Sequence, residues 1–147
     1  MTRSGRMKPV QEVVDAKERT EAKQLAVSEE HLAASERKLD ELRQYEQDYR
    51  QGFKSRAAAG MGGHGLRDYQ LFLARLGEAV RQQSKIVGAA RAERDAQQDH
   101  WREAARHHKA VDHVVGTWQA EERRHAERRE QRDSDERAQR KAQRHAE

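Results

Sequence analysis

The sequence predicts an all-α protein in which two long helices form an antiparallel coiled-coil hairpin. Three observations carry this prediction: the composition, a seven-residue apolar repeat and one glycine-rich break. Of the 147 residues, 38% are charged and 34% are hydrophobic, and there is one proline. Arg, Glu, Ala, Gln and Lys dominate, and they favour helices with a narrow apolar seam over a thick core. Disorder is the competing interpretation of such a composition, and the repeat favours helix.

The clearest repeat lies in the second half of the chain, where apolar residues recur at a mean spacing of 3.5 residues. A straight helix drifts about 20° per heptad against such a pattern, so the stripe stays on one side only if the helix supercoils around a partner. The members of the stripe are Leu66, Tyr69, Leu73, Leu76, Val80, Val87, Ala90, Trp101, Ala104, Val111, Val115 and Trp118.

A first arm, about residues 8–55, begins near Pro9, because proline fits the first turn of a helix. Leu25, Leu32 and Leu39 repeat every seven residues along it. Polar residues also fall on this seam, where they weaken a coiled coil but can fix its register. These polar seam residues are Glu18, Glu21, Ser28, Ser35 and Glu46.

A glycine-rich turn is expected over residues 56–65, and a second arm over about residues 66–140. Glycines cluster in this turn and break helices. Folding about residue 60 places Leu39 near residues 78–81 and makes residues 1–147 a single two-helix rod. Leu25 then faces polar residues of the second arm, so the hairpin should be loosest there. A parallel homodimer of one continuous helix is the alternative, and the glycines oppose it.

The second arm is longer than the first. In this register Pro9 lies near Val111, which leaves Val115 and Trp118 without an obvious partner in the chain. Either the residues before Pro9 extend the first arm and cover these two side chains, or the two side chains bind another protein.

No pattern of catalytic chemistry stands out. Gly60, Gly62 and Gly65 match the G-x-G-x-x-G spacing, but a dinucleotide site needs a preceding strand, and none is evident. The histidines lack a zinc-ligand motif, and His108 falls on the seam. A two-helix hairpin also lacks a concave pocket for tuning catalytic groups. We therefore expect a non-enzymatic chain with no cofactor and no metal site.

The charge pattern and hydropathy bear on partners and location. Net charge is +4, but the tail 121–147 interleaves Arg with Glu and Asp, which is typical of a solvated helix face and not of a nucleic-acid surface. No apolar run approaches the ~20 residues of a membrane span. The sequence lacks cysteine, which fits a reducing cytoplasm. We expect a cytoplasmic protein that neither binds nucleic acid nor inserts into the membrane.

Apolar residues beside the seam indicate a protein-binding surface. Tyr45, Phe72, Ala79 and Ile86 all occupy the flanking position just before a seam residue, so antiparallel pairing brings these flanks together. Tyr49 lies one turn from Tyr45, and Leu76 lies one turn from Phe72. Exposed aromatic patches often mark interfaces, although these residues could also simply widen a thin core.

Two segments resemble the FliJ family of bacterial flagellar export proteins. The segment 42–50, Leu-Arg-Gln-Tyr-Glu-Gln-Asp-Tyr-Arg, is similar to the end of that family's first helix. The segment 66–79, Leu-Arg-Asp-Tyr-Gln-Leu-Phe-Leu-Ala-Arg-Leu-Gly-Glu-Ala, is similar to the start of its second helix. The match carries over to Tyr45, Tyr49, Phe72, Leu76 and Ala79 as protein-binding residues.

The resemblance implies a stalk-like component of the flagellar type III export apparatus, at the cytoplasmic face of the inner membrane. Its implied partners are the hexameric export ATPase FliI, the regulator FliH, the export-gate protein FlhA and export chaperones. By analogy, the end with both termini meets the ATPase ring, and the aromatic patch meets the gate. The equivalent stalk of a virulence secretion system and a structural or homodimeric coiled coil remain alternatives.

Overall fold

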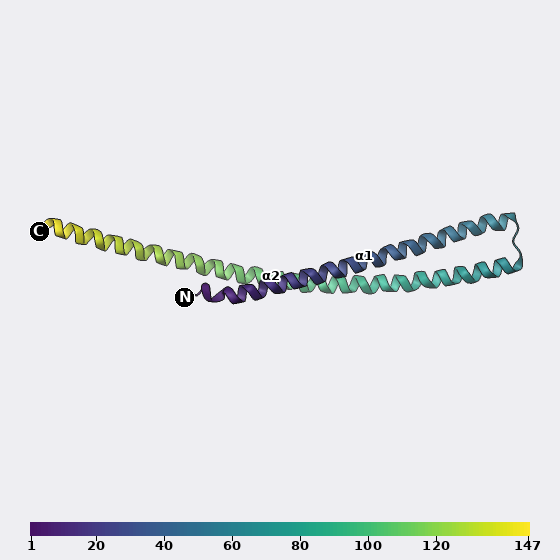
Figure 1. Cartoon of the computed structure of the whole chain (residues 1–147), viewed down its shortest axis with the longest axis horizontal. Coiled ribbons are helices and arrows are strands. Elements are labelled where there is room, and N and C mark those ends of the chain that lie inside the picture. Colours follow the sequence, from purple (N-terminus) through teal and green to yellow (C-terminus); the bar gives the residue numbers. More distant parts are fainter. The chain divides into compact units, whose positions relative to one another are not determined.

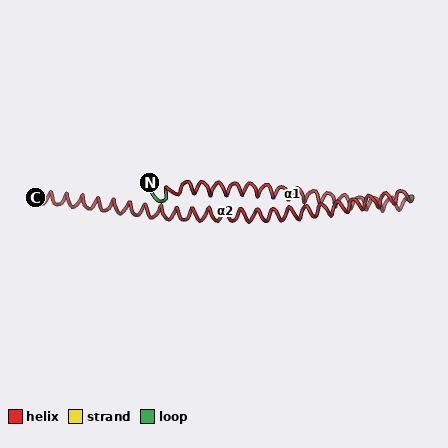
Figure 2. The backbone as a smooth tube through the Cα atoms, turned by 90° about the horizontal axis from the view of Figure 1, so that it is seen from below, coloured by secondary structure: helices red, strands yellow, loops and turns green.

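The computed structural model describes all of residues 1–147 and contains two long α-helices in contact, with no strand (Figures 1 and 2). A 3₁₀ turn, Gly5–Met7, precedes helix α1, Lys8–Ala59, of 52 residues. Helix α2, Gly63–Ala146, has 84 residues. The predicted all-α antiparallel coiled-coil hairpin is confirmed.

The chain divides into two compact units. The loop unit comprises residues 21–101 and contains the turn between the helices. The terminal unit comprises residues 1–20 and 102–147. Each unit contains segments of both helices and has its own apolar cluster.

The turn of the loop unit is shorter than the sequence indicated. Only residues 60–62 lie outside the helices. Residues 56–59 continue α1, because the run of alanines before Gly60 has a high helix propensity. Gly60 ends the helix with a φ of 97° and donates its N–H to the carbonyl of Ala57 at 3.2 Å. This positive φ is the left-handed conformation that glycine supplies at helix ends.

The loop unit packs along the expected seam. Its buried cluster consists of Leu32, Leu39, Val87 and Ala90, and Val80 packs against it. Leu39 therefore shares a cluster with a residue of the segment 78–81, as the predicted register requires. The seam alternates apolar layers with polar ones, as the imperfect heptads of the first arm indicated.

Buried polar residues of the loop unit are hydrogen-bonded. The hydroxyl of Ser35 donates to the carbonyl of His31 in its own helix at 2.8 Å. Gln83 is 5% exposed and donates its side-chain amide across the seam to the carbonyl of Ser35 at 3.0 Å. Gln97 donates to the carboxylate of Glu21 at 2.5 Å. These cross-helix bonds fix the register, because a shifted pairing would leave buried polar groups without partners.

The terminal unit supplies a partner for Val115, which the sequence had left open. Val115 is 1% exposed and clusters with Val14 and Val111, and Met7 packs against them. Of the two alternatives, the extension of the first arm is correct, because residues before Pro9 continue along α2.

An N-terminal clasp, formed by Arg3 and Ser4, holds the start of the chain on α2. Ser4 donates its backbone N–H and its hydroxyl to the carboxylate of Glu122, at 2.9 and 2.5 Å. The Arg3 guanidinium lies 4.2 Å from the ring centroid of Trp118 and 2.7 Å from Glu121. Trp118 is therefore half-covered within the chain. The hydrogen bonds from Ser4 lower the pKa of Glu122 below its ordinary value.

A histidine–carboxylate layer occupies the seam of the terminal unit. His108 lies on the seam, as its heptad position predicted, and its Nδ1 contacts the carboxylate of Glu18. Its Nε2 lies 3.3 Å from Asp112 and 4.0 Å from Asp15. The hydrogen bond to Glu18 raises the pKa of His108, burial opposes the rise, and the three carboxylate charges add to it.

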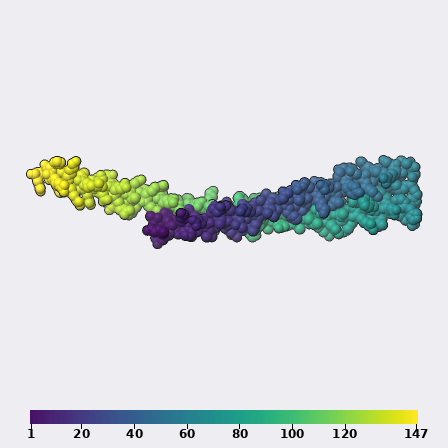
Figure 3. All heavy atoms as spheres, in the orientation of Figure 1, coloured from purple at the N-terminus to yellow at the C-terminus, as the bar shows by residue number.

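Beyond the clasp, α2 continues as an exposed helix. Residues 127–147 are all exposed, and Figure 3 shows this part of the terminal unit without α1 beside it. Helix-favouring Arg, Glu, Gln and Ala dominate its sequence. An i,i+4 ion pair between Glu136 and Arg140, 3.9 Å apart, adds modest support. Neither this helix nor α1 contains a stretch apolar and long enough to cross a membrane.

Candidate protein-binding surface

The three tyrosines and two phenylalanines of the chain form one aromatic ladder in the loop unit. Its rungs alternate between α1 and α2 in the order Tyr45, Phe72, Tyr49, Tyr69 and Phe53. Tyr45 meets Phe72 edge to face, with centroids 6.1 Å apart. Tyr49 lies 4.5 Å from Phe72 and stacks on Tyr69 at 5.0 Å, and Tyr69 stacks on Phe53 at 3.6 Å.

The ladder forms because its members repeat every turn on facing sides of the two helices. Tyr45, Tyr49 and Phe53 are four residues apart on α1, so they project from one face. Aromatic pairs add about 0.5–1.5 kcal/mol each beyond the area that they bury. The ladder therefore joins the helices beside the turn with aromatic contacts instead of aliphatic seam layers.

The structure brings three of the five predicted site residues into direct contact: Tyr45, Tyr49 and Phe72. Tyr45 is 52% exposed, so its ring contacts Phe72 and still offers surface to a partner. Phe72 and Ala79 are half-buried on the same side of α2. Leu76 is different: it is 7% exposed and belongs to the seam. The term aromatic surface is used below for Tyr45, Tyr49, Phe72 and Ala79.

Phe53 and Tyr69 complete the ladder but were missing from the predicted site. Tyr69 falls on the predicted seam, and Phe53 lies within the predicted first arm, about residues 8–55, close to its end. The spacing of four residues from Tyr45 through Tyr49 to Phe53 is a signal in the sequence that links them. The stacking of Phe53 on Tyr69 could not be predicted from this spacing, because it depends on how the two helices pair beside the turn.

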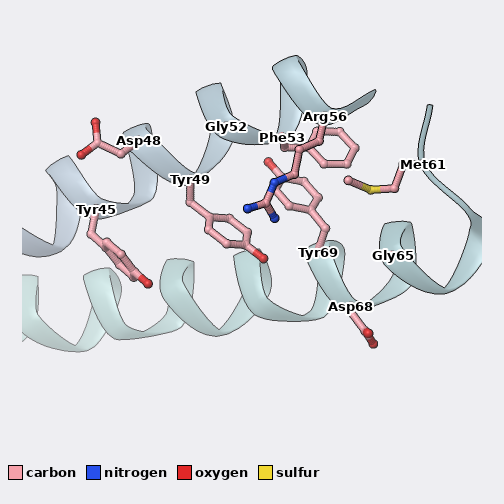
Figure 4. A pocket seen from close by; sticks show the side chains of 10 residues that line it. All are labelled: Tyr45, Asp48, Tyr49, Gly52, Phe53, Arg56, Met61, Gly65, Asp68 and Tyr69. Atoms are coloured by element: carbon pink, nitrogen blue, oxygen red, sulfur yellow. The ribbon is translucent and has the colours of Figure 1, made fainter. Parts of the chain in front are cut away.

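A cavity of about 420 Å³, here called the loop pocket, opens beside the ladder (Figure 4). Four rings line it, from Tyr45, Tyr49, Phe53 and Tyr69, together with the side chain of Met61 from the turn. A hairpin was expected to lack a concave site, so this pocket is a correction. The pocket forms because two of its lining residues, Gly52 on α1 and Gly65 on α2, have no side chain to fill the space.

Charged side chains border the loop pocket. Figure 4 shows the guanidinium of Arg56 turned toward Tyr49 and Tyr69, whereas the carboxylates of Asp48 and Asp68 point away. Arg56 forms no ion pair with a carboxylate of the chain. Asp48 accepts a hydrogen bond from Gln44 at 3.0 Å. The charge turned toward the rings is therefore positive.

The glycine motif has no dinucleotide-binding context. Gly60 ends α1, Gly62 lies in the turn, and Gly65 lies in the first turn of α2. A helix precedes these glycines where a dinucleotide site requires a strand. The motif therefore serves the helix-to-helix connection.

A family model described as "Flagellar FliJ protein" matches residues 3–147 of the chain. The chain belongs to the FliJ family. FliJ is a component of flagellar type III protein export, so this chain is assigned to that export system. Searches of curated proteins and of solved structures gave no significant match. The match extends through the aromatic ladder, the clasp and the exposed end of α2.

Proposed function

We propose that this FliJ-family chain is a non-enzymatic, stalk-like adaptor of the flagellar export apparatus. It binds the export ATPase FliI, together with FliH, through the terminal unit and the export-gate protein FlhA through the aromatic surface. Binding promotes entry of flagellar subunits, which export chaperones deliver. The observation that carries this proposal is the aromatic surface, in which Tyr45 is 52% exposed although its ring packs against Phe72.

The aromatic surface suits a gate contact. Tyr45 presents about half of its surface to solvent while its ring is held by Phe72. Large aromatic side chains held in place lose little conformational entropy on binding, and they are frequent interface anchors. Ile86, 46% exposed, extends the apolar surface along the same flank of α2.

The terminal unit suits repeated, exchangeable contacts with ring subunits. Its exposed end of α2 interleaves both signs of charge, and its ion pairs lie at the surface. Exposed ion pairs contribute about 0–1 kcal/mol each, so a ring subunit can exchange them for its own charges at little cost. Association with the cytoplasmic face of the inner membrane then occurs through the gate.

The gate contact is tested with the double variant Tyr45→Ala/Phe72→Ala. We expect it to lose binding to the cytoplasmic domain of FlhA and to reduce motility, with helicity preserved in circular dichroism. Leu71→Ala is the matched control, because Leu71 neighbours Phe72 and is 54% exposed on another face. Leu76→Ala is a poor test, because Leu76 is buried and its loss destabilises the seam. Unchanged FlhA binding by the double variant would contradict the assignment.

The ATPase contact is tested by adding the purified chain to FliI and measuring ATP hydrolysis. We expect a higher rate and more hexamer. The Tyr45→Ala/Phe72→Ala variant should stimulate FliI as well as the wild type, because its substitutions lie in the loop unit. Absence of both binding and stimulation would argue against the stalk-like role.

A further inference from the structure

We propose that the histidine–carboxylate layer of the terminal unit is a proton-operated latch: with His108 protonated it holds residues 8–20 of α1 on α2, and with His108 neutral it lets this segment open. Opening uncovers the apolar cluster that Val14 forms with Val111 and Val115. The latch is a regulatory device of the chain itself. It goes beyond the proposed function and depends on neither FlhA nor FliI.

Three carboxylates converge on one imidazole across the seam of the terminal unit. Asp15 and Glu18 come from α1, and Asp112 comes from α2, one turn from His108 itself. The Nδ1 atom of the ring contacts Glu18, and its Nε2 atom lies 3.3 Å from Asp112 and 4.0 Å from Asp15. Both ring nitrogens therefore face carboxylate oxygens. The imidazolium, which has two N–H donors, suits this site better than the neutral ring, which has one.

The proton on His108 decides whether the charges of this layer attract or repel. The charges that act on the ring are those of the three carboxylates. Arg19 pairs with Asp15 at 2.9 Å, but its side chain is 69% exposed, so solvent screens its charge. Gln11 donates a hydrogen bond to Asp112 at 3.4 Å and brings no charge. Loss of the proton therefore replaces attraction across the seam with repulsion between Asp112 of α2 and the two carboxylates of α1.

The segment that the latch controls has little other attachment to α2. Val14 is the only buried residue among residues 8–20. It lies next to Asp15 in the chain, and Val111 precedes Asp112, so the apolar cluster and the charged layer are neighbours along both helices. A segment with a single buried side chain gains little from apolar packing. The charged layer therefore has a large share in holding it on α2.

The surroundings of His108 place the switch on the alkaline side of the ordinary histidine pKa of 6.5. The hydrogen bond to Glu18 raises the pKa of His108, burial opposes the rise, and the charges of Asp112, Glu18 and Asp15 add to it. The closed form binds the proton more tightly than the open form. The latch is therefore closed below pH 6.5 and opens as the pH rises through the raised pKa.

The N-terminal clasp keeps the opened segment tethered to α2. Ser4 donates two hydrogen bonds to Glu122, and they lower the pKa of this carboxyl, so it stays ionised at alkaline pH. Arg3, which lies over Trp118, also keeps its charge there. The clasp is weakened by acid, whereas the latch is weakened by alkali. Opening at alkaline pH is therefore local, and it reverses when the proton returns.

The test measures hydrogen-exchange protection factors of backbone amides in the full chain from about pH 6 to about pH 9. A protection factor is corrected for the intrinsic pH dependence of exchange, so it reports the opening equilibrium of each segment. Residues 10–20 report on the latch, and residues 30–40 of the loop unit are the internal reference. His108→Gln removes the titration, and His108→Lys keeps a positive charge up to its ordinary pKa of about 10.4. His113→Gln is the matched control, because His113 is exposed on the same helix.

We expect the protection factors of residues 10–20 to fall about tenfold as the pH rises, because a hydrogen bond between charged groups changes an equilibrium constant by about this factor or more. Those of residues 30–40 should stay constant. His108→Gln should give low protection of residues 10–20 at every pH, and His108→Lys should give high protection at every pH. His113→Gln should follow the wild type. A histidine that only filled space would not separate the lysine variant from the glutamine variant in this way.

Three results would overturn the proposal. They are wild-type protection of residues 10–20 that does not change with pH, the same alkaline fall in His108→Gln as in the wild type, or protection in His108→Lys as low as in His108→Gln. Circular dichroism of both variants first establishes that they remain helical. The exchange test uses the free chain, so a negative result would reject the latch and leave the FlhA and FliI contacts to their own assays.

Discussion

Truncation of Val115 to alanine should destabilise the free chain measurably. Val115 is 1% exposed and lies between Val14 and Val111. The substitution removes two buried methyl groups, worth roughly 1.6 kcal/mol at about 0.8 kcal/mol per carbon, and leaves a small cavity. Alanine has a higher helix propensity than valine, which offsets roughly 0.5 kcal/mol of this loss of unfolding free energy. The net loss of unfolding free energy is about 1–2 kcal/mol.

The assay is thermal unfolding followed by circular dichroism at 222 nm. A loss of this size lowers the melting temperature by roughly 2–8 °C in a chain of this length. Val13→Ala is the matched control, because Val13 is 67% exposed in the same unit. It makes the same chemical change and gains the same helix propensity, so its melting temperature should stay constant or rise. Equal melting temperatures for the two variants would refute the pairing of Val115 with the N-terminal segment.

Three further predictions concern the turn, the seam histidine and the clasp. Gly60→Ala should cost about 1 kcal/mol in unfolding free energy, because Gly60 has a φ of 97°, whereas Gly62→Ala should cost less in the same denaturant titration. The raised pKa of His108 predicts that this residue stabilises the fold fully below pH 6.5, the ordinary pKa of histidine, and that the stabilisation is lost as the pH rises through the raised pKa. His108→Gln should therefore flatten the fall of the melting temperature with rising pH. The lowered pKa of Glu122 predicts the opposite dependence: its contribution is present above about pH 4.5 and is lost as the pH falls through the lowered value. Glu122→Gln should remove this part of the acid transition, and an unaltered transition would count against the clasp.

The helices and their register could be predicted because they depend on a periodic signal. The heptad stripe fixed which side of each helix faces the other, and the glycines fixed where the chain reverses. Leu39 and Val80 accordingly share a cluster. Polar seam positions such as Ser35 and Glu21 were also identified, because the heptad count places a residue on the seam whatever its chemistry.

Other features could not be predicted from periodicity. The clasp depends on Arg3 and Ser4, which precede the first heptad and carry no repeat. The loop pocket depends on how Phe53 stacks on Tyr69 and on the direction of Arg56, which are set by contacts across the turn. Heptads predict which residues face a partner helix, but they do not predict the cavities left where glycine replaces a larger side chain.

The central claim is that the two helices of one chain pair antiparallel with a defined register, and cysteine cross-linking tests it most directly. The native sequence contains no cysteine, so the introduced cysteines are the only thiols in each variant. The double variant Ser35→Cys/Gln83→Cys places thiols at residues that contact each other across the seam. Treatment with a short bismaleimide should give an internally linked monomer with altered electrophoretic mobility, and neither single variant should cross-link. Cross-linked dimers from Ser35→Cys alone would instead indicate a parallel pairing of two chains and would contradict the hairpin.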